Sequence, residues 1–274
     1  MPELPEVETI ARGLNSCIRG VHILRVQVHN AHLRLPVRPR RLQRVVSGSR
    51  IIAVRRRGKY LLIDLDNDWS LLIHLGMSGG LRLVEAQVAR KKHEHVVFCL
   101  QAGRDLRFCD PRRFGLIEAV RTNGHEDCIH LRHLGPEPLS GAFDAAYVYS
   151  KTRGRTVAVK NWLMNAGNVV GVGNIYANEA LFRAGLDPRR RAGTLSKPQA
   201  SRVVLAVTAV LSEAIEAGGT TVRDFRGAQG ELGYFALALA VYGLAGEPCS
   251  RCRAKIRHVV LGGRSTYFCP RCQR

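Results

Sequence analysis

The chain has 274 residues, with 42 Lys and Arg against 22 Asp and Glu, which gives a formal net charge of +20. So basic a chain favours a polyanionic partner such as nucleic acid, and 46% hydrophobic residues can bury a core larger than one small module. Acidic residues stand where a secretory signal has its basic region, and the longest uncharged run, 232–246, is shorter than the ~18–20 residues of a membrane span. We therefore expect a soluble cytoplasmic protein that enters no membrane, and a monomer, because no oligomerisation signal is visible.

The first predicted element is a helix that begins near Pro5 and ends before Gly20. Proline suits the first turn of a helix, and the acidic residues that follow suit its positive end. The apolar residues that recur at helical spacing are Val7, Ile10, Ala11, Leu14 and Ile18. Such a helix buries one face and would fix the N-terminus in place.

Pro2 is a candidate nucleophile because removal of Met1 would expose its secondary amine. An N-terminal amine titrates at about 7.7–8.0, against about 10.4 for lysine, so it needs less pKa depression to react near neutrality. A secondary amine that attacks a sugar carbon can become an iminium ion, which makes neighbouring C–O bonds breakable without a metal. The alternative is that this proline only marks the start of an ordered chain, because a dipeptide is a weak motif.

Residues 21 to about 120 are predicted to form short strands. Apolar and β-branched runs separated by turn residues indicate strands over 21–28, 51–54, 60–65, 71–75, 96–100, 105–108 and 116–120. Turn residues at Asn67-Asp68 and Ala102-Gly103 join two pairs of them. Several short strands at close spacing are typical of a β-sandwich or barrel.

After a linker at 135–138, where Gly-Pro-Glu-Pro breaks the strand pattern, the sequence predicts helices. One covers 174–183 and follows a glycine turn; another begins at the capping box Ser196-x-x-Gln199 and ends at Gly218-Gly219. The apolar stripe predicted for the second helix is Val204, Val207, Leu211 and Ile215. Helices approached through glycine turns can direct backbone N–H groups at a phosphate.

The eight cysteines divide into two groups. Two Cys-x2-Cys pairs separated by sixteen residues have the spacing of zinc ribbons and β-hairpin fingers, and these are Cys249, Cys252, Cys269 and Cys272. Four thiolates fill a tetrahedral site, so the zinc would be structural and would activate no water. Two disulfides are the alternative, which a reducing cytosol disfavours.

The residues between the pairs predict two strands, 257–260 and 265–268, joined by a turn that presents Arg264. The other four, Cys17, Cys99, Cys109 and Cys128, are interpreted as packing residues.

Five motifs occur in a fixed order from the first residue to the last finger. They are PELPEVE at 2–8, HLGMSG at 74–79, DPRRFG at 110–115, VGVGNIYA at 170–177 and the four-cysteine pattern. Together they resemble the bacterial formamidopyrimidine-DNA glycosylase family, whose members act on 8-oxoguanine in DNA. The resemblance implies an α+β multidomain protein with four parts. These are an N-terminal β-sandwich catalytic domain with an N-terminal helix (1–135), a linker and the start of the helical domain (136–150), a helix-two-turn-helix DNA-binding domain (151–246) and a β-hairpin zinc finger (247–274).

The resemblance also implies a bifunctional DNA glycosylase and AP lyase for damaged double-stranded DNA, with one structural zinc ion and no catalytic metal or organic cofactor. Pro2 would attack the anomeric carbon of the damaged nucleotide, and Glu3 would protonate the opening sugar ring or shuttle the proton. Lys59 would lie near phosphate and the proton transfers of β-elimination, and Arg264 would grip the flanking phosphates and serve δ-elimination. Both cations would lower the pKa of the Pro2 amine by like-charge repulsion.

A damaged base must leave the stack before its sugar can be reached, and side chains that fill the vacated space offset the cost. The resemblance gives this work to Phe114 as an apolar wedge, Met77 as an adaptable filler and Arg112 as a donor to the orphaned cytosine. Judged by residue type alone, Met77 and Phe114 would be core residues. The other positions that match DNA contacts are His93, Arg155, Asn174 and Lys160. Asn174 has a plain alternative as a helix N-cap.

Some segments depart from the family pattern. Residues 165–168 lack the acidic residue that usually follows Leu-Met, Leu244-Ala245 replaces basic residues, and Glu231-Leu232 replaces Lys-Pro in the loop 226–233, which resembles the loop that covers the flipped base. These changes leave the base preference open. One alternative is an enzyme resembling endonuclease VIII that prefers oxidised pyrimidines, but such enzymes usually lack the HLGMSG and DPRRFG segments. The other is a non-catalytic DNA-binding module, which the intact Pro2, Glu3, Lys59 and Arg264 argue against.

Overall fold

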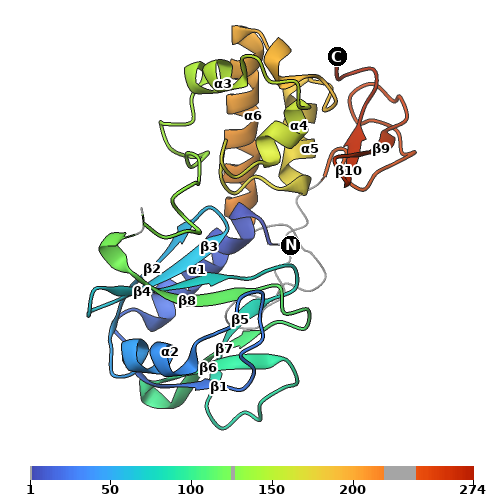
Figure 1. Ribbon diagram of the computed structural model, residues 1–274. Helices are drawn as coiled ribbons and strands as arrows, with labels where there is room; N and C mark the ends of the chain where they lie inside the picture. Colours follow the sequence, from blue (N-terminus) through green and yellow to red (C-terminus); the bar gives the residue numbers. More distant parts are fainter. Residues whose placement is uncertain (1, 125–126, 219–238) are drawn as a thin grey trace. The chain divides into compact units, whose positions relative to one another are not determined.

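The computed structural model describes residues 2–124, 127–218 and 239–274, and the chain forms two compact units (Figure 1). Among the described residues, unit 1 contains 2–124, 127–132 and Gly218, and unit 2 contains 133–217 and 239–274. Within the described ranges, none of the helices combines the length and the apolar character needed to cross a membrane.

Unit 1 is built from two antiparallel four-stranded sheets, two α-helices and two short 3-10 helices, as far as its residues are described. One sheet has the order β1-β6-β7-β5, with the bounds Ile23–Val28, Glu94–Leu100, Arg104–Cys109 and Gly80–Glu85. The other has the order β2-β3-β4-β8, with the bounds Ile51–Arg57, Tyr60–Leu65, Trp69–His74 and Leu116–Arg121. Helix α1 (Leu4–Ile18) packs against β2 and β3, and α2 (Pro39–Val46) packs against β1 and β8. Buried residues of both sheets and both helices form one core, which confirms the predicted β-sandwich with an N-terminal helix.

Helix α1 follows directly from its sequence. Pro5 lies in its first turn, where the missing N–H costs nothing, and Glu6 lies at its positive end. Its buried face contains the predicted apolar residues Val7, Ile10, Ala11, Leu14 and Ile18. The helix ends two residues before Gly20, as predicted.

Each predicted strand of unit 1 overlaps an observed one, but strand β5 and helix α2 were not predicted. Only Leu81 of β5 is fully buried, so the strand shows little of the alternation that marks a half-buried sheet. Helix α2 is short and carries three arginines beside its three buried residues Leu42, Val45 and Val46. Tertiary packing, rather than local pattern, decides both elements.

Unit 2 combines helices with a small hairpin (Figure 1). Its helices are α3 (Ala145–Thr152), α4 (Val159–Met164), α5 (Asn174–Ala184) and α6 (Lys197–Glu216). The hairpin consists of β9 (Arg257–Leu261) and β10 (Arg264–Phe268), and α5 packs against both α6 and β10. At the hairpin turn, Gly262 and Gly263 have φ of +57° and +71°, as a two-residue type I′ turn requires. The predicted hairpin is confirmed.

Helix α6 begins at the predicted capping box, where the Ser196 hydroxyl accepts from the Gln199 N–H and the Gln199 side chain accepts from the Ser196 N–H. The predicted stripe needs one correction. Val203, rather than Val204, lies on the buried face, because helical spacing aligns it with Val207 and Val210. The second glycine of the predicted helix end, Gly219, lies outside the described residues.

Candidate active site and metal centre

The N-terminus is held in place by helix α1. Pro2 is half-buried, and Glu3, which directly precedes the helix, is buried. The Glu3 backbone N–H donates to the Glu6 carboxylate at 2.8 Å, and the Glu3 carbonyl accepts from the Val7 N–H at 3.1 Å. These bonds fix the residue that follows Pro2, so a buried helix sets the position of Pro2, as predicted. Met1 lies outside the described residues.

Lys59 lies in the tight turn between strands β2 and β3, against which α1 packs. Arg56 of β2 connects the helix to this turn, because its guanidinium donates to the Glu8 carboxylate at 2.8 Å and to the Gly58 carbonyl at 3.1 Å. Burial opposes ionisation of Glu8, but the guanidiniums of Arg56 and Arg12 outweigh it and hold the pKa of the Glu8 carboxyl below its ordinary value. A charged link therefore joins the helix after Pro2 to the turn that carries Lys59.

Met77 and Phe114 lie on two loops of unit 1 and are exposed. Met77 follows β4 and is 40% exposed, and Phe114 precedes β8 and is 45% exposed. Arg112 is exposed as well, and its guanidinium carbon lies over the Phe114 ring, 4.8 Å from the centroid. The interpretation of Met77 and Phe114 as core residues is therefore wrong. All three side chains are accessible to a ligand.

His74, the first residue of the HLGMSG segment, holds the start of the loop that follows β4. Its Nδ1 accepts the Gly76 N–H at 2.9 Å. Burial, together with the charges of Arg34 and Lys59, lowers the pKa of His74 to about 4. The ring is therefore neutral near neutral pH and keeps its acceptor nitrogen.

Two further predicted DNA contacts lie one in each unit. His93 of unit 1 directly precedes β6, is half-buried and meets the His95 ring edge-on, with 6.2 Å between the ring centroids. Arg155 of unit 2 is exposed and follows α3. Both can reach a ligand from the surface of their own unit.

Lys160 and Asn174 both bind the backbone of the hairpin strand β10. Lys160 of α4 is fully buried, and its Nζ donates to the Ser265 carbonyl at 2.9 Å and to the Thr266 hydroxyl at 2.7 Å. Asn174, the first residue of α5, donates through Nδ2 to the same Ser265 carbonyl at 3.0 Å. Its buried Oδ1 has no hydrogen-bond partner within the described part of the chain. Both side chains therefore hold the residue next to Arg264.

Arg264 itself is exposed at the start of β10, opposite Leu261 of β9. The turn before it lies close to α4, because a Cβ on Gly262 would come within 2.5 Å of the Asn161 side chain. Further along β10, the Tyr267 N–H donates to Asn178 Oδ1 of α5 at 2.7 Å. The hairpin is thus attached to α4 near its turn and to α5 along β10, the strand that begins at Arg264.

The four predicted zinc ligands form one cluster. Their sulfur atoms all lie within 4.8 Å of one another, and Cys249 and Cys269 are fully buried. The Sγ atoms of Cys249 and Cys272 are 3.9 Å apart, and those of Cys252 and Cys269 are 3.4 Å apart. A disulfide requires about 2.05 Å, whereas sulfurs about 2.3 Å from a tetrahedral zinc ion lie roughly 3.8 Å apart. The cluster therefore fits one structural zinc ion and excludes the disulfide alternative. The cysteines predicted to pack, Cys17, Cys99, Cys109 and Cys128, are partly buried.

Sequence reasoning missed a buried carboxylate in unit 2. Glu179 of α5 accepts three backbone N–H groups, from Ala240 at 2.9 Å, Val241 at 3.0 Å and Tyr242 at 2.8 Å. It thereby fixes the segment that leads into the cysteine cluster. The sequence feature that could have indicated this role is the presence of an acidic residue among the buried positions of α5.

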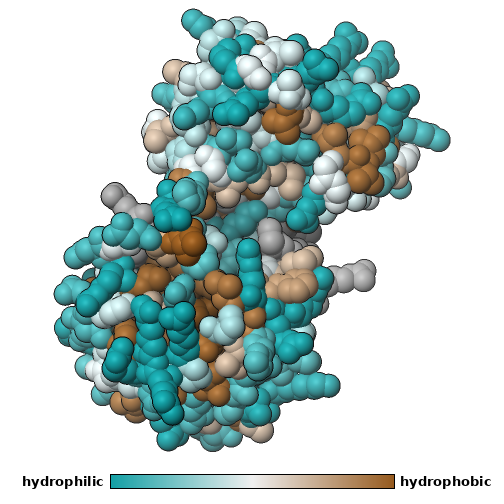
Figure 2. Space-filling model, viewed as in Figure 1, coloured by the Kyte–Doolittle hydropathy of each residue, from teal (hydrophilic) through white to brown (hydrophobic). Residues whose placement is uncertain are grey.

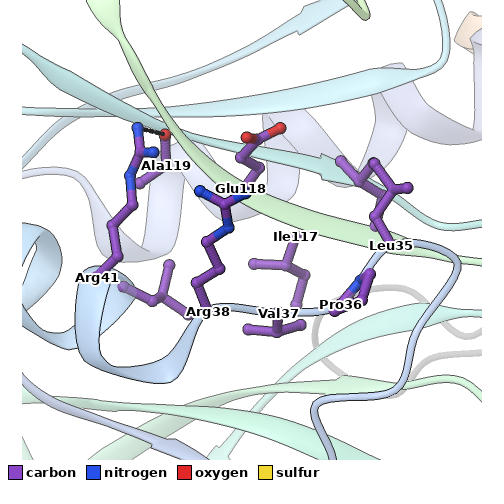
Figure 3. Close-up of a pocket in the computed structure, with 10 residues that line it drawn as sticks. Leu35, Pro36, Val37, Arg38, Arg41, Ile117, Glu118 and Ala119 are labelled. Carbon is purple, nitrogen blue, oxygen red and sulfur yellow. Dashed lines mark hydrogen bonds between the residues drawn. The ribbon is translucent and has the colours of Figure 1, made fainter.

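The surface of unit 1 carries hydrophobic side chains among many hydrophilic ones (Figure 2). One apolar groove of about 200 Å³ lies between α2 with the segment before it and strand β8 (Figure 3). Arg38 and Arg41 line it together with apolar residues, and Arg41 donates to the Ala119 carbonyl at 3.4 Å. None of the predicted site residues lines this groove, so it adds nothing to the candidate site.

Comparisons with known proteins agree with this arrangement. Three family models match successive parts of the chain: the formamidopyrimidine-DNA glycosylase N-terminal domain at 1–117, the H2TH domain of the same glycosylase at 134–226, and the zinc finger found in FPG and IleRS at 246–274. The formamidopyrimidine-DNA glycosylase of Halorhodospira halophila is 52% identical over 274 residues, which cover 100% of both chains.

Two solved structures of Lactococcus lactis Fpg have the same fold. A variant in complex with DNA that contains Fapy-dG matches with a TM-score of 0.91 at 33% identity, over 100% of both chains. A complex with DNA that contains an abasic site also matches with a TM-score of 0.91 at 33% identity, over 99% of both chains. The predicted fold class, with its β-sandwich, helix-two-turn-helix region and zinc finger, is confirmed.

Proposed function

The chain belongs to the formamidopyrimidine-DNA glycosylase family, and on that premise we propose that Pro2, exposed by removal of Met1, is the nucleophile of its reaction. The enzyme is a bifunctional DNA glycosylase and AP lyase that excises oxidised purines, acts on damaged double-stranded DNA as a single chain, and contains one structural zinc ion. The observation that supports Pro2 is its fixed position, half-buried beside the buried Glu3 at the start of α1.

In the first step the Pro2 nitrogen attacks C1′ of the damaged nucleotide, and the bond from C1′ to the base breaks. The base leaves with a proton. Glu3 donates a proton to O4′ as the sugar ring opens, and the nitrogen lone pair forms the C1′ iminium. A buried carboxyl next to the nucleophile suits this proton transfer, because the chain holds Glu3 beside Pro2 and no acid has to diffuse into the site.

The iminium then acts as the electron sink for strand cleavage. Loss of a C2′ proton expels the 3′ phosphate by β-elimination, and a second elimination expels the 5′ phosphate. Lys59 and Arg264 are proposed to hold these phosphates, since each is a cation presented by a tight turn. Positive charge at the site also favours the neutral, nucleophilic form of the Pro2 amine.

We assign the remaining predicted residues by where they lie. Met77, Phe114 and Arg112 fill the space left by the flipped base, because all three are exposed. His93 and Arg155 contact the DNA backbone. Asn174 and the buried Lys160 position the Arg264 strand through Ser265. The domain boundaries at 135, 150 and 246 and the cytoplasmic location stay predictions, and the loop 226–233, expected to cover the flipped base, lies outside the described residues.

The test is a duplex with one 8-oxoguanine opposite cytosine, treated with zinc-loaded protein whose loss of Met1 is verified by mass spectrometry. We expect strand cleavage that leaves phosphate at both ends, and a covalent protein–DNA product when borohydride reduces the iminium. Pro2→Gly should slow base release and strand cleavage together while leaving binding to an abasic-site analogue largely intact. Wild-type protein that cannot be trapped would refute Pro2 as the nucleophile.

Two comparisons delimit the function further. A matched duplex with an oxidised pyrimidine tests the endonuclease VIII-like preference, and we expect slower excision there than with 8-oxoguanine. Binding of any duplex should weaken steeply with salt, because neutralised phosphates release counterions.

A further inference from the structure

Two loops of unit 1 carry the side chains that are assigned to the base stack, and both close around one carboxylate. Residues 75–79 connect β4 to β5 and carry Met77, and residues 110–115 connect β7 to β8 and carry Arg112 and Phe114. Asp110, at the start of the second loop, is fully buried.

The Asp110 carboxylate accepts hydrogen bonds from both loops. Its Oδ1 accepts from the Ser78 hydroxyl at 3.2 Å, across the gap between the loops, and from the Arg112 N–H at 3.3 Å. Its Oδ2 accepts from the Gly115 N–H at 2.7 Å. One side chain therefore fixes the residue after Met77 and the residues at either end of the Arg112–Phe114 segment.

The two loops also touch without space for a side chain between them. A Cβ on Gly76 would come within 2.6 Å of the Phe114 carbonyl carbon, and Gly76 has a φ of +67°, which favours glycine. A Cβ on Gly115 would come within 2.9 Å of the His74 carbonyl oxygen. The backbone of the second loop therefore packs directly against the first loop and against the end of β4, and Asp110 adds the side-chain bonds that hold the two loops in register.

The main chain of Asp110 extends the connection to a third predicted DNA contact. Its N–H donates to the His93 carbonyl at 3.0 Å, and its carbonyl accepts from His95 Nε2 at 2.8 Å. Asp110 is thus bonded to the segments that carry His93, Met77, Arg112 and Phe114. Each of those residues comes from the surface of the same unit.

From these contacts we infer that Asp110 is a positioning residue that joins the two loops into one preassembled wedge. Met77, Arg112 and Phe114 then enter the vacated stack as a rigid group. Because these side chains are already ordered in the free protein, binding loses little conformational entropy when the base flips. This inference rests on the proposed function, because it concerns how those three side chains meet damaged DNA. It assigns Asp110 no contact with substrate.

The test compares Asp110→Asn with wild type on two substrates. The amide keeps one acceptor oxygen, but its NH₂ group cannot accept from the donors on the other side, so the loops lose their common anchor. We expect kcat/KM for excision of 8-oxoguanine from duplex DNA to fall by about 10- to 100-fold. Borohydride trapping on a single-stranded abasic oligonucleotide, which has no stack to fill, should stay within about two-fold of wild type.

Two further measurements separate positioning from general destabilisation. The matched control is Asp64→Asn, which alters another buried carboxylate of unit 1, bound by Arg55 and Ser70 at the opposite end of the β3–β4 pair. It should lower the unfolding temperature without changing the ratio of the two activities. The fluorescence of 2-aminopurine placed beside the lesion rises when the bases unstack. The rise on binding should be smaller for Asp110→Asn than for wild type, and unchanged for Asp64→Asn.

The inference is wrong if Asp110→Asn leaves the ratio of duplex excision to single-stranded trapping unchanged, whether both activities fall equally or neither falls. If Asp110→Asn does not fold, Ser78→Ala removes only the bond between the loops, and it must lower duplex excision while sparing single-stranded trapping. Wild-type protein that fails on single-stranded abasic DNA would instead count against the nucleophile, whatever Asp110 does.

Discussion

Unit 1 carries Pro2 and Lys59 on elements that share one large hydrophobic core, whereas unit 2 carries Arg264 on a hairpin with little core of its own. Helix α1 and strands β2 and β3 contribute many of the buried side chains of unit 1. The hairpin region has a small cluster in which two of the five fully buried members are the cysteines Cys249 and Cys269. The residues proposed for one reaction therefore lie in two parts of the chain that are stabilised by different forces.

Polar side chains and the metal replace the missing core around Arg264. Buried groups of α4 and α5 bind the main chain of the finger region: Lys160 and Asn174 at Ser265, Asn178 at Tyr267 and Glu179 at residues 240–242. Buried polar contacts are specific in direction but costly when one partner is lost. We expect the hairpin region to tolerate changes in apolar volume better than changes in these donors and acceptors.

The chain offers a probe for each unit, because its two tryptophans are Trp69 in β4 and Trp162 in α4. Trp162→Phe leaves fluorescence that reports unit 1, and Trp69→Phe leaves fluorescence that reports unit 2. Unfolding of each variant can be followed in both backgrounds. We expect each substitution to change the stability of one unit and to leave that of the other unchanged.

Loss of zinc should have the largest effect. Cys249→Ser removes one of four thiolates, and because metal binding supplies about 10–16 kcal/mol to folding of such sites, the finger should unfold. We expect duplex affinity to fall by about 100-fold or more while the Trp69 signal of unit 1 keeps its urea midpoint. Cys128→Ser, at a partly buried cysteine outside the cluster, is the matched control. Normal duplex binding by Cys249→Ser would contradict the metal dependence.

Lys160→Met should have the next largest effect. The substitution keeps the aliphatic length but leaves the Ser265 carbonyl and the Thr266 hydroxyl buried without their donor. We expect unit 2 to lose about 2–4 kcal/mol and to release zinc faster to a chromogenic chelator. The exposed Lys151 of α3 supplies the control, Lys151→Met, which should change neither quantity. Were both variants equally stable, Lys160 would not be holding the hairpin.

The sequence predicted what depends on local pattern. The face of α1, the capping box of α6, the cysteine cluster and the hairpin turn each follow from a pattern within one continuous segment of the chain. The contact made by the Lys160 side chain could not be predicted, because its partner Ser265 lies more than a hundred residues away in the chain. The role inferred for Asp110 depends likewise on which loops the sheets bring together. Strand β5 was not predicted either, and its place in the sheet is set by its pairing with β7, since Leu81 is its one buried residue.

Acid should weaken unit 1 through His74. Its pKa in the folded state, about 4, lies below the ordinary 6.5, so the unfolded chain takes up the proton first as pH falls. The stability that the neutral ring contributes is complete above pH 6.5 and is lost as pH falls through about 4. The slope is at most about 1.4 kcal/mol per pH unit, and the total loss of stability is at most about 3.4 kcal/mol.

Urea titrations between pH 7 and 4, followed by Trp69 fluorescence, measure this loss. His74→Asn offers an acceptor oxygen in place of Nδ1 without a titrating ring, so the slope over this window should become shallower. If the variant and wild type lose stability in parallel, the acid sensitivity of unit 1 has another source.

An exposed ion pair in unit 2 should matter least, although it joins two helices. Arg183 of α5 and Glu213 of α6 bind through both carboxylate oxygens, which raises the pKa of the Arg183 guanidinium and lowers that of the Glu213 carboxyl. Their side chains are 34% and 48% exposed, so water and salt screen the attraction. We expect Arg183→Ala to cost less than about 1 kcal/mol in Trp162-monitored unfolding, and still less in high salt. A loss as large as that of Lys160→Met would show that this exposed ion pair stabilises unit 2 as much as the buried polar contacts do.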